Sequence, residues 1–164
     1  VDKLSSSLAD NIQNSTPRKI FTIGNIKTTQ NETHLDIQKY SNTLSSLYPK
    51  TPNKYSVLEI LQKFIADGNI ADVSALSLLD PIIKRDEGLV AGMLKMEVPE
   101  SLAVLHLNLT NSVEKVLENL NDIKLYDSDP IVSLTAISQY ENNSVTVGSE
   151  ILNIEKVIAQ KLKI

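Results

Sequence analysis

The sequence predicts an all-α protein, a bundle of five or six helices with an extended N-terminal arm. Apolar residues recur at spacings of three and four along most of the chain, as they do on one face of a helix. Only five glycines and six prolines occur in 164 residues, which is too few for a turn-rich all-β fold. Aromatic residues make up 4% of the chain and tryptophan is absent, so leucine, isoleucine and valine must build the core.

The length of the chain fits a single helical domain spanning residues 1–164. We expect residues 1–30 to form an N-terminal helix and an extended arm, and residues 31–164 to form the helical bundle. The helix is expected within residues 1–14, which carry a narrow apolar stripe, and the arm within residues 18–30, which are rich in isoleucine. A short strand in this arm is not stable alone in water, so it must lie on the helical body or on a partner.

Three helices are expected next, over residues 31–48, 54–67 and 71–79. Each has apolar residues at helical spacing. The two prolines in Tyr48–Pro52 make a rigid loop between the first two helices, and Asp67–Asn69 ends the second.

Three of the six prolines are expected to mark helix starts. In Asp80-Pro81 and Asp129-Pro130, Asp is expected at the N-cap, where its carboxylate accepts an otherwise unpaired N–H, and Pro at the first helical position. Val98-Pro99-Glu100 is expected to start a helix with an acid in its first turn. The stretch YDSDPIVS, residues 126–133, is therefore interpreted as a helix cap, since it lacks the further oxygen ligands and the glycine of a calcium loop.

The two longest helices are expected over residues 99–125 and 130–164, and we predict that they form a central antiparallel hairpin. The first has a seven-residue stripe of Leu102, Leu105, Leu109, Val113, Val116, Leu120 and Ile123. The second has a stripe of Ile131, Leu134, Ile137, Val145, Ile151, Leu152, Ile158 and Leu162. Consecutive asparagines and Gly148 predict a kink or break of the second helix near residues 142–148.

Composition and motifs exclude or disfavour several kinds of site. The chain has no cysteine, which excludes disulfides, thiolate nucleophiles and cysteine-ligated metals. A formal net charge of −4 disfavours nucleic acid as a partner, and no run of 18 apolar residues is present to span a membrane. Nucleophile and phosphate-binding glycine motifs are missing, and Gly88 and Gly92 in EGLVAGML are interpreted as a close contact between helices. We therefore assign no catalytic, cofactor-binding or metal-binding residue and expect no cofactor.

The two histidines, His34 and His106, are the remaining candidates for metal or acid–base chemistry. A zinc site needs three or four ligands, and neither histidine has a second histidine near it in the sequence. His34 lies between Glu32 and Asp36, but residues two apart on a helix do not share a face. We expect both histidines to lie at the surface or at the edge of the core. A metal-dependent or hydrolytic enzyme with a site near His106 stays open as an alternative.

Residues 76–140 contain the motifs LDPII, VPESL, LHLNLTNS and SDPIVSLTAISQY. With these motifs the segment resembles a group of uncharacterised, membrane-anchored, extracytoplasmic helical proteins of small-genome bacteria. The resemblance implies a domain outside the cytoplasm, at the cell surface or in the periplasm. It also implies an N-terminal membrane segment in the full-length protein that is absent from this chain. It implies no catalytic or binding residue.

These observations favour a non-catalytic extracytoplasmic binding or scaffold domain of a membrane-anchored bacterial protein, with a protein partner in the cell envelope. The missing catalytic motifs, the seam-like helices and the extended arm all favour it. Besides the enzyme with a site near His106, one more alternative is a subunit that self-assembles through the apolar stripe of residues 99–125 or of residues 1–14.

Overall fold

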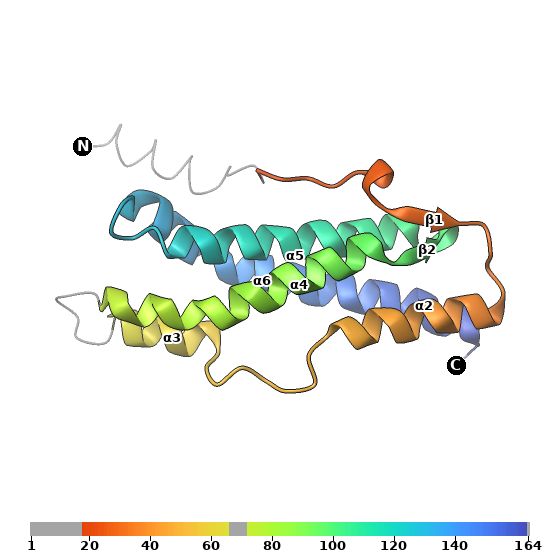
Figure 1. Ribbon diagram of the computed structural model, residues 1–164, viewed down its shortest axis with the longest axis horizontal. Helices are drawn as coiled ribbons and strands as arrows, with labels where there is room; N and C mark the ends of the chain where they lie inside the picture. Colours follow the sequence, from red (N-terminus) through yellow and green to blue (C-terminus); the bar gives the residue numbers. More distant parts are fainter. Residues whose placement is uncertain (1–17, 66–71, 164) are drawn as a thin grey trace.

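The computed structural model describes residues 18–65 and 72–163, and it confirms the all-α prediction (Figure 1). The α-helices of this part of the chain are α2 (His34–Leu47), α3 (Val57–Ile65), α4 (Asp80–Lys95), α5 (Ala103–Ile123) and α6 (Pro130–Leu162). Short 3-10 helices cover Ile23–Asn25, Val73–Leu79 and Glu100–Leu102. Two short strands, β1 (Lys27–Thr29) and β2 (Glu97–Pro99), complete the described elements. The helix expected within residues 1–14 lies outside the described residues.

The centre of the molecule is the predicted antiparallel hairpin of α5 and α6, which make the most extensive contact between any two described elements (Figure 1). Helix α4 packs mainly on α5, and α2 packs on α6 and α4. The stripe predicted over residues 99–125 forms the inner face of this hairpin: six of its seven side chains are buried and Leu105 is half-buried.

Two clusters of buried apolar side chains follow one another along the hairpin. The first fills the space between α2, the second half of α4, the start of α5 and the end of α6. The second lies between α3, residues 73–79, the start of α4, the end of α5 and the start of α6. Helices α2 and α4 approach closely at Gly92, where a Cβ atom would lie 2.6 Å from Leu47 Cδ2. The predicted close contact is therefore confirmed at Gly92, whereas Gly88 has no neighbour within 4 Å of such an atom.

Of the two predicted aspartate caps, the structure has one, and it also has the third predicted helix start. The Val132 N–H donates to Asp129 Oδ1 at 3.1 Å, and Pro130 is the first residue of α6, so the interpretation of YDSDPIVS as a cap is confirmed. Asp80 is not a cap, because the 3-10 helix of residues 73–79 continues directly into α4. Its carboxylate pairs instead with Lys124. At the third site a 3-10 helix begins at Glu100 and continues into α5, so the predicted helix start with an acid in its first turn is confirmed, but Pro99 is the N-cap and not the first helical residue.

Helix α6 runs without interruption from Pro130 to Leu162, so the predicted break near residues 142–148 is wrong. The buried Asn143 side chain donates to Asn119 Oδ1 on α5, which ties this part of α6 to the core. Gly148 lowers helix propensity by roughly 1 kcal/mol relative to Ala, and the packing of the neighbouring turns outweighs that cost.

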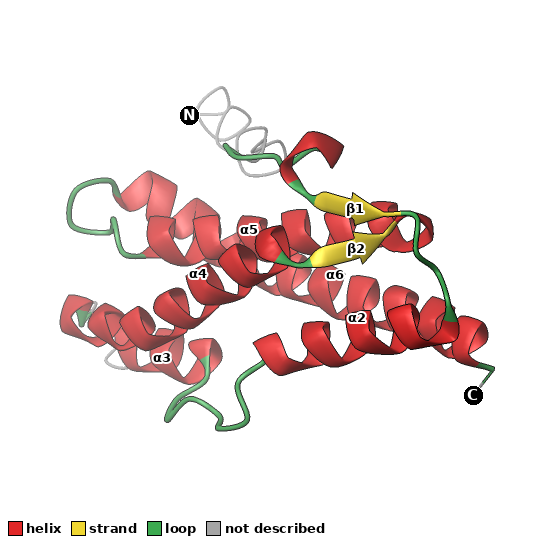
Figure 2. Cartoon of the chain, turned by 45° about the vertical axis from the view of Figure 1, so that its right-hand side comes forward, coloured by secondary structure: helices red, strands yellow, loops and turns green. Residues whose placement is uncertain are grey.

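The N-terminal arm, residues 18–33, lies on the helical body, as the sequence predicted for an extended segment (Figure 1). Its strand β1 pairs in parallel with β2, with Lys27 opposite Glu97 and Thr29 opposite Pro99 (Figure 2). The sequence does not predict β2, because Val98-Pro99-Glu100 is expected to start a helix and two residues of β2 belong to this stretch. Two strands of three residues are too short to hold the arm alone, so other contacts must contribute.

Candidate functional site

His106 lies in the centre of the core, with 0% of its surface exposed, and not at the core edge as expected. Its Nε2 lies 3.0 Å from the Met93 carbonyl oxygen, which can only accept, so Nε2 carries the proton. Its Nδ1 then accepts from the Tyr40 hydroxyl at 2.9 Å. Burial lowers the pKa of His106, and the hydrogen bond to Met93 partly opposes this shift. The imidazole is thus a neutral structural group with both nitrogens engaged.

The structure does not bring the two histidines into one site. His34 is the exposed first residue of α2, as expected for a surface histidine, whereas His106 is enclosed. Across residues 18–65 and 72–163, no three His, Asp or Glu side chains are grouped so that they could hold a metal ion. Asp127 and Asp129 of YDSDPIVS are exposed.

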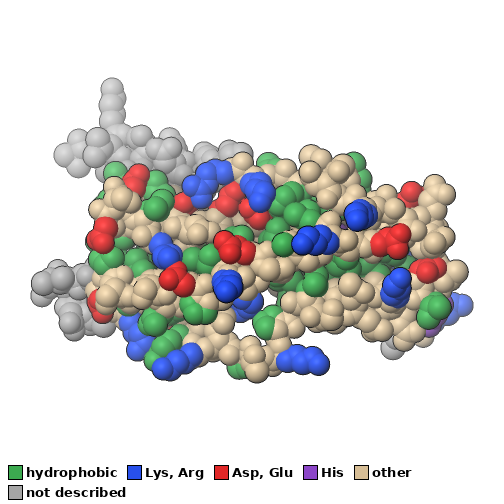
Figure 3. Space-filling model, in the orientation of Figure 1, with side chains coloured by type: hydrophobic (Ala, Val, Ile, Leu, Met, Phe, Trp, Pro, Cys, Tyr) green, Lys and Arg blue, Asp and Glu red, His purple; other side chains and the backbone are tan. Residues whose placement is uncertain are grey.

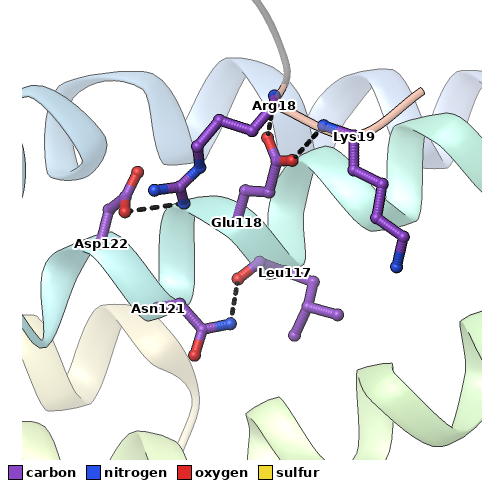
Figure 4. A network of polar contacts seen from close by, with 6 residues as sticks. All are labelled: Arg18, Lys19, Leu117, Glu118, Asn121 and Asp122. Atoms are coloured by element: carbon purple, nitrogen blue, oxygen red, sulfur yellow. Dashed lines mark hydrogen bonds and ion pairs between the residues drawn. The ribbon is translucent and has the colours of Figure 1, made fainter.

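The arm is clamped to one face of α5 by acidic side chains (Figure 4). Glu118 accepts the backbone N–H groups of Arg18 at 3.1 Å and Lys19 at 2.8 Å, one on each carboxylate oxygen. The Arg18 guanidinium donates to Asp122 Oδ1 at 2.8 Å. One carboxylate therefore satisfies two successive backbone donors of an extended chain.

A second part of the clamp lies further towards the start of α5. The Phe21 N–H donates to Asn111 Oδ1 at 2.7 Å, and Asn111 Nδ2 donates to the Phe21 carbonyl at 3.0 Å. Lys19 Nζ lies 3.4 Å from Glu114 Oε1 and 4.8 Å from the centroid of the Phe21 ring. The Asn111 side chain thus binds both backbone groups of Phe21, as the edge of a neighbouring strand would.

A groove with two lobes, here called the Tyr48 groove, runs along the α5–α6 hairpin on either side of Tyr48. The first lobe has a volume of about 490 Å³ and lies between the second half of α2, Leu109 and the last turns of α6. The second has a volume of about 320 Å³ and lies between the loop of residues 48–52, α4, Val113 and the middle of α6. Both volumes lie in or near the range of small-molecule sites, and the walls are mainly apolar.

The hydroxyl of Tyr48 is the unusual polar group of this groove. It is shielded from solvent and makes no hydrogen bond, although the rest of the side chain is half-buried. A buried polar group without a partner costs about 1–3 kcal/mol. Burial raises the pKa of Tyr48, and the nearby charges of Glu155 and Asp86 raise it further. The hydroxyl therefore keeps its proton and is a donor.

A second surface, here called the α3–α6 face, is formed by Leu58 and Ile65 of α3 and by Leu134, Val145 and Leu152 of α6. Each of these five side chains is more than half exposed. The three α6 residues are spaced by 11 and 7, close to three and two helical turns, so they share one side of the helix. A shallow apolar groove of about 770 Å³ lies between the two helices on this face.

The α3–α6 face corrects the predicted stripe of residues 130–164. Ile131, Leu134, Val145 and Leu152 point to solvent, whereas Ile158 is buried and Ile137, Ile151 and Leu162 are half-buried. The single stripe of the prediction thus divides into an inner and an outer apolar side. Its members fall on both sides because their positions on the helix form two groups: Leu134, Val145 and Leu152 share one side, and Ile137, Ile151 and Ile158 share the adjacent side.

Sequence reasoning missed the arm clamp and the Tyr48 groove. The clamp had a signal, because Asn111, Glu114, Glu118 and Asp122 recur at spacings of three and four beside the apolar stripe. Tyr48 had no such signal in the sequence, since neighbouring residues do not show that several separate elements will enclose a tyrosine.

The charges on the visible face do not define a site by themselves. Figure 3 shows Lys and Arg interspersed with Asp and Glu on that face, with hydrophobic atoms between them. The features that stand out in the described chain are the Tyr48 groove and the α3–α6 face, both of which are apolar.

The fold places the chain in the class of all-α helical bundles. Comparison with known protein families, with curated proteins and with solved structures finds no match to the chain. Among the described residues, none of the helices combines the length and the apolar character needed to cross a bilayer.

Proposed function

We propose that this domain is a non-catalytic module that binds a protein partner through the α3–α6 face. The observation that carries the proposal is the line of exposed Leu134, Val145 and Leu152 on one side of α6, of which Val145 lines the groove against α3. Exposed apolar side chains grouped over several turns are typical of interaction surfaces, whereas single ones are common on any protein.

The shape and charge of this face fit an amphipathic helix of the partner. A groove between two helices accepts the apolar side of a third helix, with anchors at every third and fourth residue. Between Pro130 and Glu150, α6 carries two acidic residues, Glu141 and Glu150, and no basic one. The expected partner helix therefore carries Lys or Arg beside its apolar anchors.

The surroundings of His106 and of the stripe of residues 99–125 argue against two of the alternatives, the enzyme and self-assembly through that stripe. A metal or hydrolytic site at His106 needs a free ring nitrogen, and both nitrogens have partners in the core. Self-assembly through the stripe of residues 99–125 needs that stripe on the surface, and the hairpin buries it.

The location of the module is proposed from the resemblance of residues 76–140 alone. On this basis we propose that the domain lies outside the cytoplasm of a bacterium, that a membrane segment of the full-length protein anchors it, and that its partner is in the cell envelope. Fractionation of cells that express the full-length protein tests this part. Cleavage of the domain by a protease added to cells or spheroplasts with an intact cytoplasmic membrane supports this location. Recovery of the domain in the cytosol contradicts it.

Site-specific photo-cross-linking in the full-length protein, in its own source, tests the binding face. A photoreactive residue replaces Val145, which is 64% exposed on the α3–α6 face, or Val104, which is 67% exposed on α5 and serves as the matched control. We expect one protein adduct from position 145, none from position 104, and loss of the adduct when Leu58→Asp is added.

The cross-linked peptide identifies the chemistry of the partner. An amphipathic helix with basic residues supports the proposal. Adducts with a second copy of the chain indicate self-assembly instead, and equal adducts from both positions, or none from either, contradict a docking site on this face.

A further inference from the structure

The Tyr48 groove is a second candidate binding site. Its first lobe shares no lining residue with the groove of the α3–α6 face, whereas its second lobe shares Tyr140 and Ser144 with it. Leu109 lies in its first lobe and Val113 in its second, one turn apart on α5, and Ile151 and Val147 lie opposite them on α6. The two lobes therefore follow one another along the hairpin, and Tyr48 lines both of them. An elongated apolar molecule matches such a shape better than a compact polar one.

The charged groups along the channel select against an anion. Arg85 and Asp86 border the second lobe and Glu155 borders the first, which gives one positive and two negative groups. The Arg85 guanidinium is already engaged, with Nε 2.7 Å from Asp86 Oδ1. A carboxylate or phosphate beside Tyr48 would meet Glu155 and Asp86 without a free cation among the described lining residues.

Tyr48 supplies the polar contact that such a ligand needs. Its hydroxyl has a proton to donate and no acceptor, and buried polar groups in folded proteins almost always have a partner. Tyr48 is also the first residue after α2 and precedes Pro49, so it lies where the helix passes into a loop. Because the hydroxyl is shielded in this structure, binding to it requires the Tyr48 ring to move towards a lobe, which a position at the end of a helix allows.

We propose that the Tyr48 groove binds a neutral, elongated apolar molecule with one carbonyl or hydroxyl oxygen, which accepts a hydrogen bond from Tyr48. The apolar chain of the ligand lies in the lobe formed by α2 and α6. Alkanols, alkyl esters and neutral acyl lipids belong to this chemical class, and fatty-acid anions do not.

An NMR titration with 1-decanol and with decanoate at neutral pH tests the class of ligand, because the two probes differ in charge at equal chain length. We expect decanol to shift the amide signals of Leu109, Val113 and Tyr48, and decanoate to bind at least about tenfold more weakly. Tyr48→Phe removes only the hydroxyl and is expected to weaken decanol binding by about fivefold.

Two tryptophan variants on α2 test the place of binding. Ser45 borders the first lobe, so Ser45→Trp fills it and is expected to weaken decanol binding by about tenfold or more. Ser46 is an equally exposed neighbour that does not line the lobe, so Ser46→Trp should change the affinity by less than about twofold. The thermal unfolding midpoint of each variant reports that the fold is kept.

Three results overturn the proposal: decanoate binding as tightly as decanol, decanol shifts confined to other residues or missing altogether, or equal affinities of Ser45→Trp and Ser46→Trp. Should Ser45→Trp fail to fold, the affinities of decanol and decanoate for the wild type and for Tyr48→Phe test the proposal. Leu58→Asp, which disables the α3–α6 face, leaves decanol binding unchanged, so the two proposals fail separately.

Discussion

At the residue scale, two buried polar groups in this core are held by specific hydrogen bonds between elements. His106 is bonded to Tyr40 and to the Met93 carbonyl, and Asn143 is bonded to Asn119. Each pair joins two helices. Because a buried donor or acceptor is costly once its partner is lost, the stability of the bundle depends on small changes of these side chains, and through His106 it also depends on pH.

His106 is expected to make the protein less stable in mild acid. Its pKa is lowered in the folded state, so from about pH 6.5 downward the unfolded chain binds a proton that the folded chain does not. The free energy of unfolding should therefore fall as the pH decreases from about 7 to about 5, by at most about 1.4 kcal/mol per pH unit. Urea denaturation at several pH values measures this slope.

His106→Gln is expected to lose the slope, whereas His34→Gln keeps it, because the imidazole of His34 lies in water. Hydrogen bonds lower the pKa of the half-buried Asp36 and the exposed Glu59 below their ordinary values, so these carboxylates change the unfolding free energy only below this pH window. An unfolding free energy that stays constant between about pH 7 and 5 in the wild type would contradict the expectation.

The Asn119–Asn143 pair is expected to show strong coupling in a double-mutant cycle. Asn143→Leu leaves Asn119 Oδ1 buried without a donor and should lower the unfolding free energy by about 1–3 kcal/mol. The double variant with Leu at both positions removes both polar groups and should lie within about 1 kcal/mol of wild type. A loss of unfolding free energy in the double variant equal to the sum of the two single losses would show that the two side chains are not coupled.

At the element scale, α5 has two different partners on two sides. Its apolar side packs into the bundle, and the side with Asn111, Glu114, Glu118 and Asp122 holds the arm. The arm adds Phe21 and Ile26 to the core. An element without helical propensity is thus ordered by side chains that satisfy its backbone and by the burial of two of its own residues.

Loss of the Asn111 amide is expected to release the start of the arm. Asn111→Ala removes both hydrogen bonds to the Phe21 backbone, each worth about 0.5–1.5 kcal/mol, and should increase the rate of trypsin cleavage after Lys19 about tenfold. Asn121→Ala is the control, because Asn121 donates only to the Leu117 carbonyl of its own helix (Figure 4). Equal cleavage rates of the two variants would show that Asn111 does not hold the arm.

At the scale of the whole molecule, α6 serves both the core and the outer surface. Leu152 is 66% exposed and Ile154, two residues further on, is 1% exposed. The same helix therefore carries residues that stabilise the fold and residues that are free to contact a partner.

Substitutions at these two positions should separate stability from binding. Leu152→Lys is expected to change the unfolding free energy by less than about 0.5 kcal/mol, because the side chain buries little surface. Ile154→Ala is expected to lower it by about 2–4 kcal/mol, through lost burial and the cavity left behind. Chemical denaturation measures both values. A large loss for Leu152→Lys would mean that the outer apolar side is covered in the folded protein.

Local patterns in the sequence predicted the helix class, the α5–α6 hairpin, the arm and the cap at Asp129. These features depend on residues close in the chain: helical periodicity, a carboxylate next to a proline, and β-branched residues beside a turn. The predicted break of α6 failed because Asn143 has a partner 24 residues away, and the cap at Asp80 failed because a preceding 3-10 helix supplies its turn.

The sequence by itself determined that the chain folds as a helical bundle and that α5 presents an apolar seam, since periodicity is written into neighbouring residues. Only the tertiary structure decided which side of α6 faces water, that His106 is enclosed by Tyr40 and Met93, and that Tyr48 stands unpaired between two lobes. The physical reason is that burial and hydrogen-bond satisfaction are properties of several elements together. Whether a given side chain is buried, exposed or unpaired depends on which distant parts of the chain pack beside it.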